Sequence, residues 1–257
     1  MGNFTGRNRV FSVMSYRFLL LLFVSLPLMG QERSYHAPRA EGRIRIDGRL
    51  SEASWQRAPL SEPFADIRGV DYDPAPVKAT HMKMLWDSEY LYVGAILEED
   101  QVTATLKEHD SIIFHDNDFE VFIDPDGDGL RYFEIEINAF GTVMDLFMDK
   151  PYREDGQFFL PWDCRGLRSA VHVEGRINRG GAPDKGWTVE MAIPFASLMI
   201  GFDNPRSLSP WRINFSRVEW LVPGGPEENW VWNPTGEVNM HLPDRWGFVM
   251  FVDKPVR

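Results

Sequence analysis

The chain has 257 residues, of which 44% are hydrophobic, and a net charge of −11 at pH 7. This acidic balance argues against a nucleic-acid partner, because binding to phosphates needs a basic face. The single cysteine, Cys164, excludes a disulfide within the chain, and we expect a buried, inert thiol at that position.

The first 30 residues have the pattern of a secretory signal peptide. Arginines precede an apolar run from Phe18 to Gly30, which is shorter than the roughly 20 residues that a membrane-spanning helix needs. An uncleaved N-terminal anchor is the alternative. We therefore predict a signal peptide over residues 1–30 and a single mature domain over residues 31–257. That domain would have no transmembrane segment and would be secreted, periplasmic or attached to the cell surface.

Beyond residue 40 the hydrophobic pattern alternates with a period of two, which is typical of β-strands. The alternation begins at residues 43–48 and continues through residues 78–86 and 90–97, with Asp87–Glu89 as a predicted hairpin turn. It recurs further along the chain in the segments 119–124, 131–138, 141–148, 169–177, 186–193, 211–220 and 246–252.

Helices are predicted in two short segments only. Residues 51–58 open with Ser51 as a helix N-cap, and residues 194–199 begin with Pro194, which favours a first-turn position. The sequence therefore predicts an all-β fold. We expect one antiparallel β-sandwich of about ten strands, in jelly-roll or immunoglobulin-like layers, with short decorating helices.

An acidic turn follows the strand predicted at residues 119–124. Asp124, Asp126 and Asp128 stand two residues apart and are followed by Gly129, as in the opening of a calcium loop. The twelfth position, where an EF-hand carries a bidentate glutamate, is Ile135, so an EF-hand is excluded. A structural calcium site and a plain acidic turn remain as the two interpretations.

The two strands around this turn share an acidic face. Alternation places Glu120 on the same side of the sheet as Glu134, Glu136 and Asn138. Such a face is usually the solvated side of an antiparallel sheet. The alternatives are a platform that accepts hydrogen bonds from sugar hydroxyls, and a pair of carboxyl groups that hydrolyses glycosidic bonds.

The last third of the chain combines tryptophans with amides. Trp230 and Trp232 alternate within a polar segment that also holds Asn229 and Asn233, so both rings would lie on one face of a strand. Flat aromatic rings stack on the apolar faces of sugars, while amides bind the hydroxyl groups. Packing of these rings in the core is the alternative interpretation.

Several of these segments, in this order and spacing, resemble the family 9 carbohydrate-binding modules and their bacterial relatives, which share a wider DOMON-type β-sandwich. The resemblance extends over residues 42–252. It is carried by the segments 46–55, 84–97, 118–129, 133–146, 184–195, 211–220 and 245–251.

The resemblance implies a sugar held between two aromatic rings, one at Phe114 and one at Trp232. It assigns hydrogen bonds to sugar hydroxyls to Glu120, Glu136 and Asn229, although the family carries an arginine at the position of Glu136. It also implies structural calcium, for which Asp124, Asp126 and Asp128 are the predicted ligands.

The predicted function is therefore that of a secreted, non-catalytic module without an organic cofactor. It would bind polysaccharide or oligosaccharide chains, or their ends, and support their breakdown by separate enzymes. Three rival functions remain open at this point: a haem-binding or redox subunit of the DOMON type, a glycoside hydrolase, and a surface-assembly protein without a small ligand.

Overall fold

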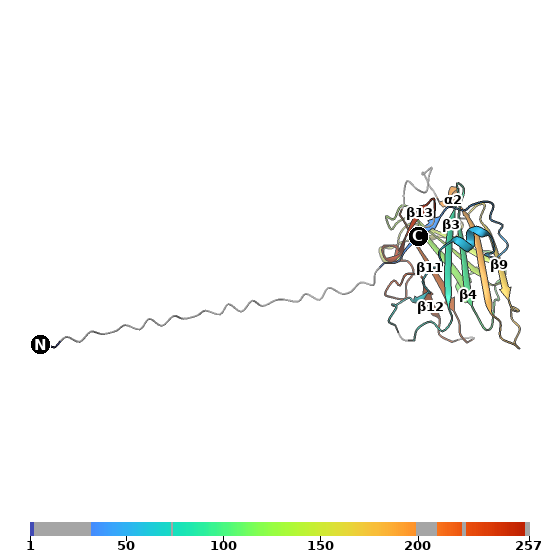
Figure 1. The fold of residues 1–257 in the computed structure, drawn as a ribbon. Helices are drawn as coiled ribbons and strands as arrows, with labels where there is room; N and C mark the ends of the chain where they lie inside the picture. Colours follow the sequence, from blue (N-terminus) through green and yellow to red (C-terminus); the bar gives the residue numbers. More distant parts are fainter. Residues whose placement is uncertain (3–31, 73, 199–209, 223–224, 255–257) are drawn as a thin grey trace.

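The computed structural model describes residues 1–2, 32–72, 74–198, 210–222 and 225–254 as two β-sheets packed face to face (Figure 1). The predicted all-β sandwich is confirmed. The predicted signal peptide falls almost entirely on residues 3–31, outside the described part. Among the described residues, no helix is long and apolar enough to cross a membrane.

The smaller sheet has four antiparallel strands in the order β3-β4-β10-β9. The Asp87–Glu89 segment forms the predicted hairpin turn between β3 and β4, and Asp87 Oδ1 accepts hydrogen bonds from the backbone N–H groups of Glu89 and Tyr90. The strands are β3 (Thr80–Trp86), β4 (Tyr90–Glu98), β9 (Arg168–Glu174) and β10 (Gly186–Pro194).

The larger sheet follows the order β1-β13-β11-β5-β6-β7-β8, and β12 and β2 extend it beside β11. All its pairs are antiparallel except β1 with β13. Its strands are β1 (Ser34–Pro38), β2 (Ala65–Asp66), β5 (Asp118–Asp124), β6 (Tyr132–Asn138), β7 (Val143–Met148), β8 (Phe158–Phe159), β11 (Trp211–Glu219), β12 (Glu228–Val231) and β13 (Gly247–Val252).

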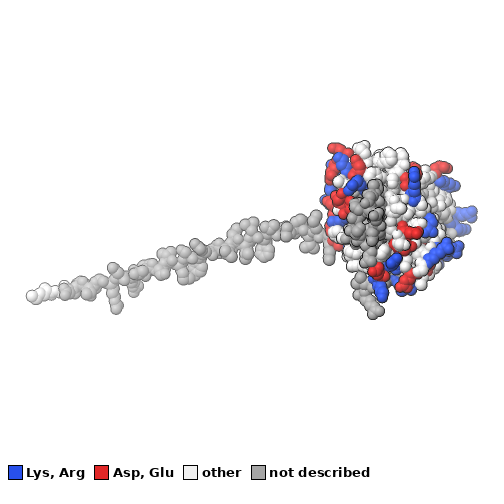
Figure 2. All heavy atoms as spheres, turned by 90° about the horizontal axis from the view of Figure 1, so that it is seen from above, with Lys and Arg blue, Asp and Glu red and all other residues white. Residues whose placement is uncertain are grey.

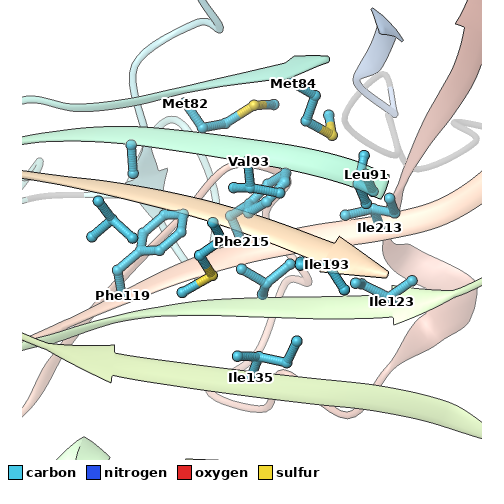
Figure 3. Packing of buried hydrophobic residues seen from close by; sticks show 14 of the residues in the cluster. Met82, Met84, Leu91, Val93, Phe119, Ile123, Ile135, Ile193, Ile213 and Phe215 are labelled. Carbon is cyan, nitrogen blue, oxygen red and sulfur yellow. The ribbon is translucent and has the colours of Figure 1, made fainter. Parts of the chain in front are cut away.

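The main core lies between the two sheets. Figure 3 shows Met82 and Val93 of the smaller sheet facing Phe119, Ile135 and Phe215 of the larger sheet. These residues occupy alternate positions of their strands, as the period of two predicts. The remaining alternate side chains of the larger sheet point away from the main core, onto its outer face.

Helices and 3-10 turns are short, and the first helix packs Trp55 over the outer face of the smaller sheet. The predicted helix at 51–58 is shorter than expected, and Glu52 rather than Ser51 occupies its N-cap position, without a side-chain hydrogen bond. The elements are α1 (Ala53–Arg57), α2 (Phe195–Leu198), η1 (Ile113–His115), η2 (Tyr152–Glu154) and η4 (Pro243–Arg245). Met199, the last residue of the second predicted helix, is outside the described residues.

Residues 43–48 were predicted as a strand, and this prediction is wrong. The segment packs Ile44 against Trp55 over the outer face of the smaller sheet, without joining a ladder. Its backbone is hydrogen-bonded to a side chain instead of a strand. Glu190 Oε2 accepts hydrogen bonds from the N–H groups of Asp47 and Gly48 at 2.9 and 3.0 Å. Alternation alone cannot distinguish a strand from such a side-chain-anchored extended segment.

Candidate functional site

A pocket of about 450 Å³ opens on the outer face of the larger sheet, above β5, β6 and β7. The walls of the pocket come from distant parts of the sequence, namely residues 112–114, 152–160 and 227–241, which fold over the strands. A second apolar cluster supports these segments, with Phe122 and Tyr132 from the strands packed against Trp246. The volume falls within the range of about 300–1,000 Å³ that is usual for small-ligand sites.

Glutamates form the floor of this pocket. Glu120 and Glu136 are direct cross-strand partners on β5 and β6, and Glu134 lies two residues from Glu136 on the same face. Their side chains are buried, with exposed fractions of 2–4% for the three residues. The interpretation of this face as a solvated side of the sheet is therefore wrong, because the covering segments remove it from water.

Burial raises the pKa of each floor glutamate above its ordinary value, because a low-dielectric environment disfavours the charged form. The pKa of Glu134 rises to about 7. Burial and the nearby charge of Glu120 and Glu134 raise the pKa of Glu136 well above its usual range. A neutral carboxyl group at Glu136 donates as well as accepts hydrogen bonds. Its Oε2 accepts the backbone N–H of Phe114 at 3.1 Å.

The described residues of the pocket provide no cationic side chain opposite these glutamates. Two other buried acids do have a countercharge, since Arg217 Nη2 lies 2.6 Å from both Glu99 Oε2 and Glu219 Oε2. Among the described residues that line the pocket, none is Lys or Arg. His241 also lines the pocket, and its Nε2 lies 3.7 Å from Glu134 Oε2, but burial lowers its pKa to about 4. The pocket therefore offers an anion no cationic partner among its described lining residues.

Aromatic side chains form the rim. Phe114, Tyr152 and Phe158 all line the pocket and are all exposed by more than a third. The Tyr152 ring packs edge-on against His241, with the ring centroids 4.5 Å apart. The Trp220 Nε1–H donates to the Phe114 carbonyl at 3.0 Å and fixes that part of the rim. An apolar rim over a polar floor fits a ligand with apolar faces and polar edges.

Four of the predicted ligand-binding residues, Phe114, Glu120, Glu136 and Asn229, come together in this pocket. Their role in binding stays a prediction. Asn229 donates through Nδ2 to Glu227 Oε1 at 2.7 Å, so these two side chains form one polar edge of the wall.

Trp232, the fifth predicted residue, lies in the main core and not at the pocket. Its side chain is 2% exposed and packs against Phe215, with ring centroids 5.9 Å apart. Trp230 shares that buried face and packs over the Arg217 guanidinium at 4.9 Å. The expected sugar-stacking ring at Trp232 does not fit this position, because the two sheets enclose it.

The aspartates of the acidic turn at 124–129 already have hydrogen-bond donors and a cation from nearby residues. Asp124 accepts the N–H groups of Gly127 and Gly129, both at 2.9 Å. Arg131 Nη2 lies 3.3 Å from Asp126 Oδ2 and 3.1 Å from Asp128 Oδ2. The three carboxylates are within 4.8 Å of one another, as a hard cation requires, but the guanidinium already lies against two of them.

Several residues of the pocket were not predicted from the sequence. They are Tyr152, Phe158, Glu227 and His241, and all lie on segments that connect strands or on the edge strand β8. Strand alternation cannot relate these residues to the acidic face, because they lie on other segments of the chain. The only sequence signal was the mixture of aromatic and polar residue types in those segments.

A model of the family described as "Carbohydrate family 9 binding domain-like" matches residues 46–254. The chain belongs to this family. The match covers every strand except β1, including the strands that carry the pocket floor. The predicted family resemblance is thus confirmed.

A sequence relative is the Exoglucanase XynX of Acetivibrio thermocellus, which is 25% identical over 165 residues. Those residues are 62% of this chain but 13% of the exoglucanase, so the chain spans only a small part of that enzyme.

Solved structures of family 9 modules share the fold. A module from Caldicellulosiruptor kristjanssonii in complex with cellotriose superposes with a TM-score of 0.58 at 15% identity, covering 87% of this chain and 95% of that one. The same organism's module with glucose gives 0.59 at 15% identity, with 88% and 98% covered. A candidate carbohydrate-binding protein from Bacteroides uniformis gives 0.63 at 16% identity, with 86% and 99% covered.

Proposed function

We propose that the protein is a secreted, non-catalytic module that binds glycan chains or chain ends in the pocket above β5 and β6. The observation that carries this proposal is the combination, within one pocket, of a carboxyl floor and an aromatic rim. Family membership supports it, as do the complexes of two structural neighbours with cellotriose and glucose. Bound chains would then be broken down by separate enzymes.

The chemistry of the floor restricts the class of glycan. Glu120 and Glu134 accept hydrogen bonds from hydroxyl groups, and a neutral Glu136 also donates. Because no Lys or Arg lines the pocket in the described residues, a uronate or sulfated sugar would lose its hydration without gaining a cationic partner. The ligand is therefore a neutral or amine-bearing glycan, and the rings of Phe114, Tyr152 and Phe158 contact its apolar faces.

Glycan binding is tested by array screening followed by affinity electrophoresis of single variants. Phe114→Ala should weaken retention by about 2–10-fold, the range of one aromatic contact of about 0.5–1.5 kcal/mol. Glu120→Gln should weaken it by about 2–10-fold, because replacing one carboxyl oxygen with an amide removes a hydrogen bond of about 0.5–1.5 kcal/mol. Neutral glycans should be retained and uronates should not.

Phe159→Ala is the matched control, since this exposed ring neighbours Phe158 on β8 but does not line the pocket. Unchanged retention in both Phe114→Ala and Glu120→Gln would place the ligand elsewhere and contradict the proposal. Release of reducing ends from a bound glycan, lost in Glu120→Gln, would favour the glycoside hydrolase instead.

Structural calcium at Asp124, Asp126 and Asp128 stays a prediction. An ion there would have to displace Arg131 from Asp126 and Asp128, so its binding would reorganise the turn. We expect calcium to raise the melting temperature of the wild-type protein and to have no effect on Asp126→Asn. A melting curve of the wild-type protein that is the same in calcium and in chelator would identify the segment as a plain acidic turn.

A further inference from the structure

A group of titratable side chains lies beside β7, outside the pocket, where three segments of the chain meet. His109 and Asp110 belong to the segment between β4 and η1, Asp145 to β7, and Asp163 to the segment between β8 and β9. The His109 Nε2 atom lies 3.5 Å from Asp110 Oδ1, 3.5 Å from Asp163 Oδ1 and 3.8 Å from Asp145 Oδ1.

The imidazole is oriented by the backbone. His109 Nδ1 lies 2.9 Å from the Val143 carbonyl oxygen, which can only accept, so Nδ1 carries the proton and donates. In the neutral ring, Nε2 then directs its lone pair toward the three carboxylates. This arrangement is repulsive unless a cation or a proton lies between them. A carbonyl partner on one nitrogen is also the usual way in which metal-binding histidines are held.

A buried carboxylate oxygen, Asp145 Oδ1, also faces the His109 Nε2 atom. The Asp145 side chain is 3% exposed, and its Oδ2 accepts the Cys164 N–H at 2.7 Å. Its Oδ1, the atom directed toward His109, has no hydrogen-bond partner, and neither has Asp110 Oδ1. Buried polar atoms without a partner are costly. Two of them around one imidazole nitrogen indicate a missing ligand.

We propose that His109, Asp110 and Asp163 bind a divalent transition-metal ion of the Zn²⁺ type, with Asp145 Oδ1 facing the ion from the buried side. Bonds of about 2.0–2.2 Å place neighbouring ligand atoms of a tetrahedral site about 3.3–3.6 Å apart, close to the separations observed. Ligand atoms of His109, Asp110 and Asp163 all lie within 4.8 Å of one another. An imidazole donor favours such an ion over calcium, whose ligands are oxygens.

The surroundings fit this ion. The side chains of His109 and Asp163 are 54% and 59% exposed, so an ion can enter from solvent. The neighbouring Cys164 thiol is not part of the group of ligand atoms that lie within 4.8 Å of one another, so the site is built from one imidazole and carboxylates. The ion would link the three segments and stabilise the folded state by an amount that rises with the logarithm of its affinity and concentration.

The test is calorimetric titration of the chelator-stripped, full-length protein with ZnCl₂, together with melting curves. We expect one Zn²⁺ per chain at this site and a higher melting temperature. His109→Ala and Asp163→Asn should abolish both effects, and Asp145→Asn should weaken binding by about 10–100-fold. Asp126→Asn, in the acidic turn, and His172→Ala, on β9 of the other sheet, should leave binding unchanged.

The alternative occupant is a proton. Burial lowers the pKa of His109, but Asp110 and the other carboxylates outweigh that effect and raise it. Absence of Zn²⁺ binding by the wild-type protein, or binding that survives both His109→Ala and Asp163→Asn, would overturn the proposal. Binding of CaCl₂ but not ZnCl₂ at this cluster would do the same.

Discussion

Trp232→Ala is expected to lower the free energy of unfolding by about 3–5 kcal/mol, the range for removing a large aromatic side chain from a core. The ring packs against Phe215, and Gly247 leaves room for it, since a Cβ atom at that glycine would lie 2.4 Å from the Trp232 ring. In a chain of this size the change corresponds to a fall in melting temperature of about 6–20 °C. Urea unfolding and thermal melting measure both quantities.

The control for this substitution is again Phe159→Ala, whose ring is exposed, and which should change stability by no more than about 0.5 kcal/mol. Gly247→Ala should also destabilise the fold, because the added methyl group meets the Trp232 ring. Glycan retention by Trp232→Ala, measured below its melting temperature, should match the wild-type protein. Normal stability with lost retention would instead make Trp232 a ligand contact.

The fold was accessible from the sequence because the period of two is strong and repeated. In β5, Phe119, Val121 and Ile123 fill the main core as the alternation predicts. The segment 43–48 has the same alternation but is not a strand, since Glu190, 142 residues away from Gly48, bonds its backbone. A partner so distant in sequence leaves no local signal in the segment it holds.

The candidate site could be predicted from the sequence only in part, because its residues also depend on partners that are distant in the sequence. The acidic face of Glu120, Glu134 and Glu136 follows from strand alternation, but its burial depends on segments that fold over it. Trp230 and Trp232 were correctly placed on one face, yet a polar sequence around them suggested exposure. Instead, β12 joins the larger sheet and places Trp230 in the main core, and Trp232, one residue beyond its end, bonds to the Phe215 carbonyl and joins the same core. The direction in which a short strand faces is set by its neighbours.

Stability should fall as the pH rises from 6.5 to 8.5, because of the carboxyl groups on the pocket floor. Unfolded glutamates titrate near pH 4.3 and are ionised throughout this range. In the folded protein, burial and the charge of Glu120 keep the pKa of Glu136 well above that value, and burial likewise raises that of Glu120. The folded state therefore binds more protons than the unfolded state, and each such group reduces the free energy of unfolding by about 1.4 kcal/mol per pH unit until it ionises.

Glu136→Gln isolates this effect, because the amide resembles the neutral acid and keeps an oxygen for the Phe114 N–H. Its free energy of unfolding should fall less steeply with pH than that of the wild-type protein, so that the two curves diverge toward pH 8.5. The pKa of the facing His241 is lowered to about 4, so this residue does not titrate in the window. Urea unfolding at pH 6.5, 7.5 and 8.5 measures the slopes, with the exposed Glu89→Gln as the control. Parallel curves for Glu136→Gln and the wild-type protein would mean that Glu136 is ionised in the folded state, and the pocket would then need a bound cation to hold its floor together.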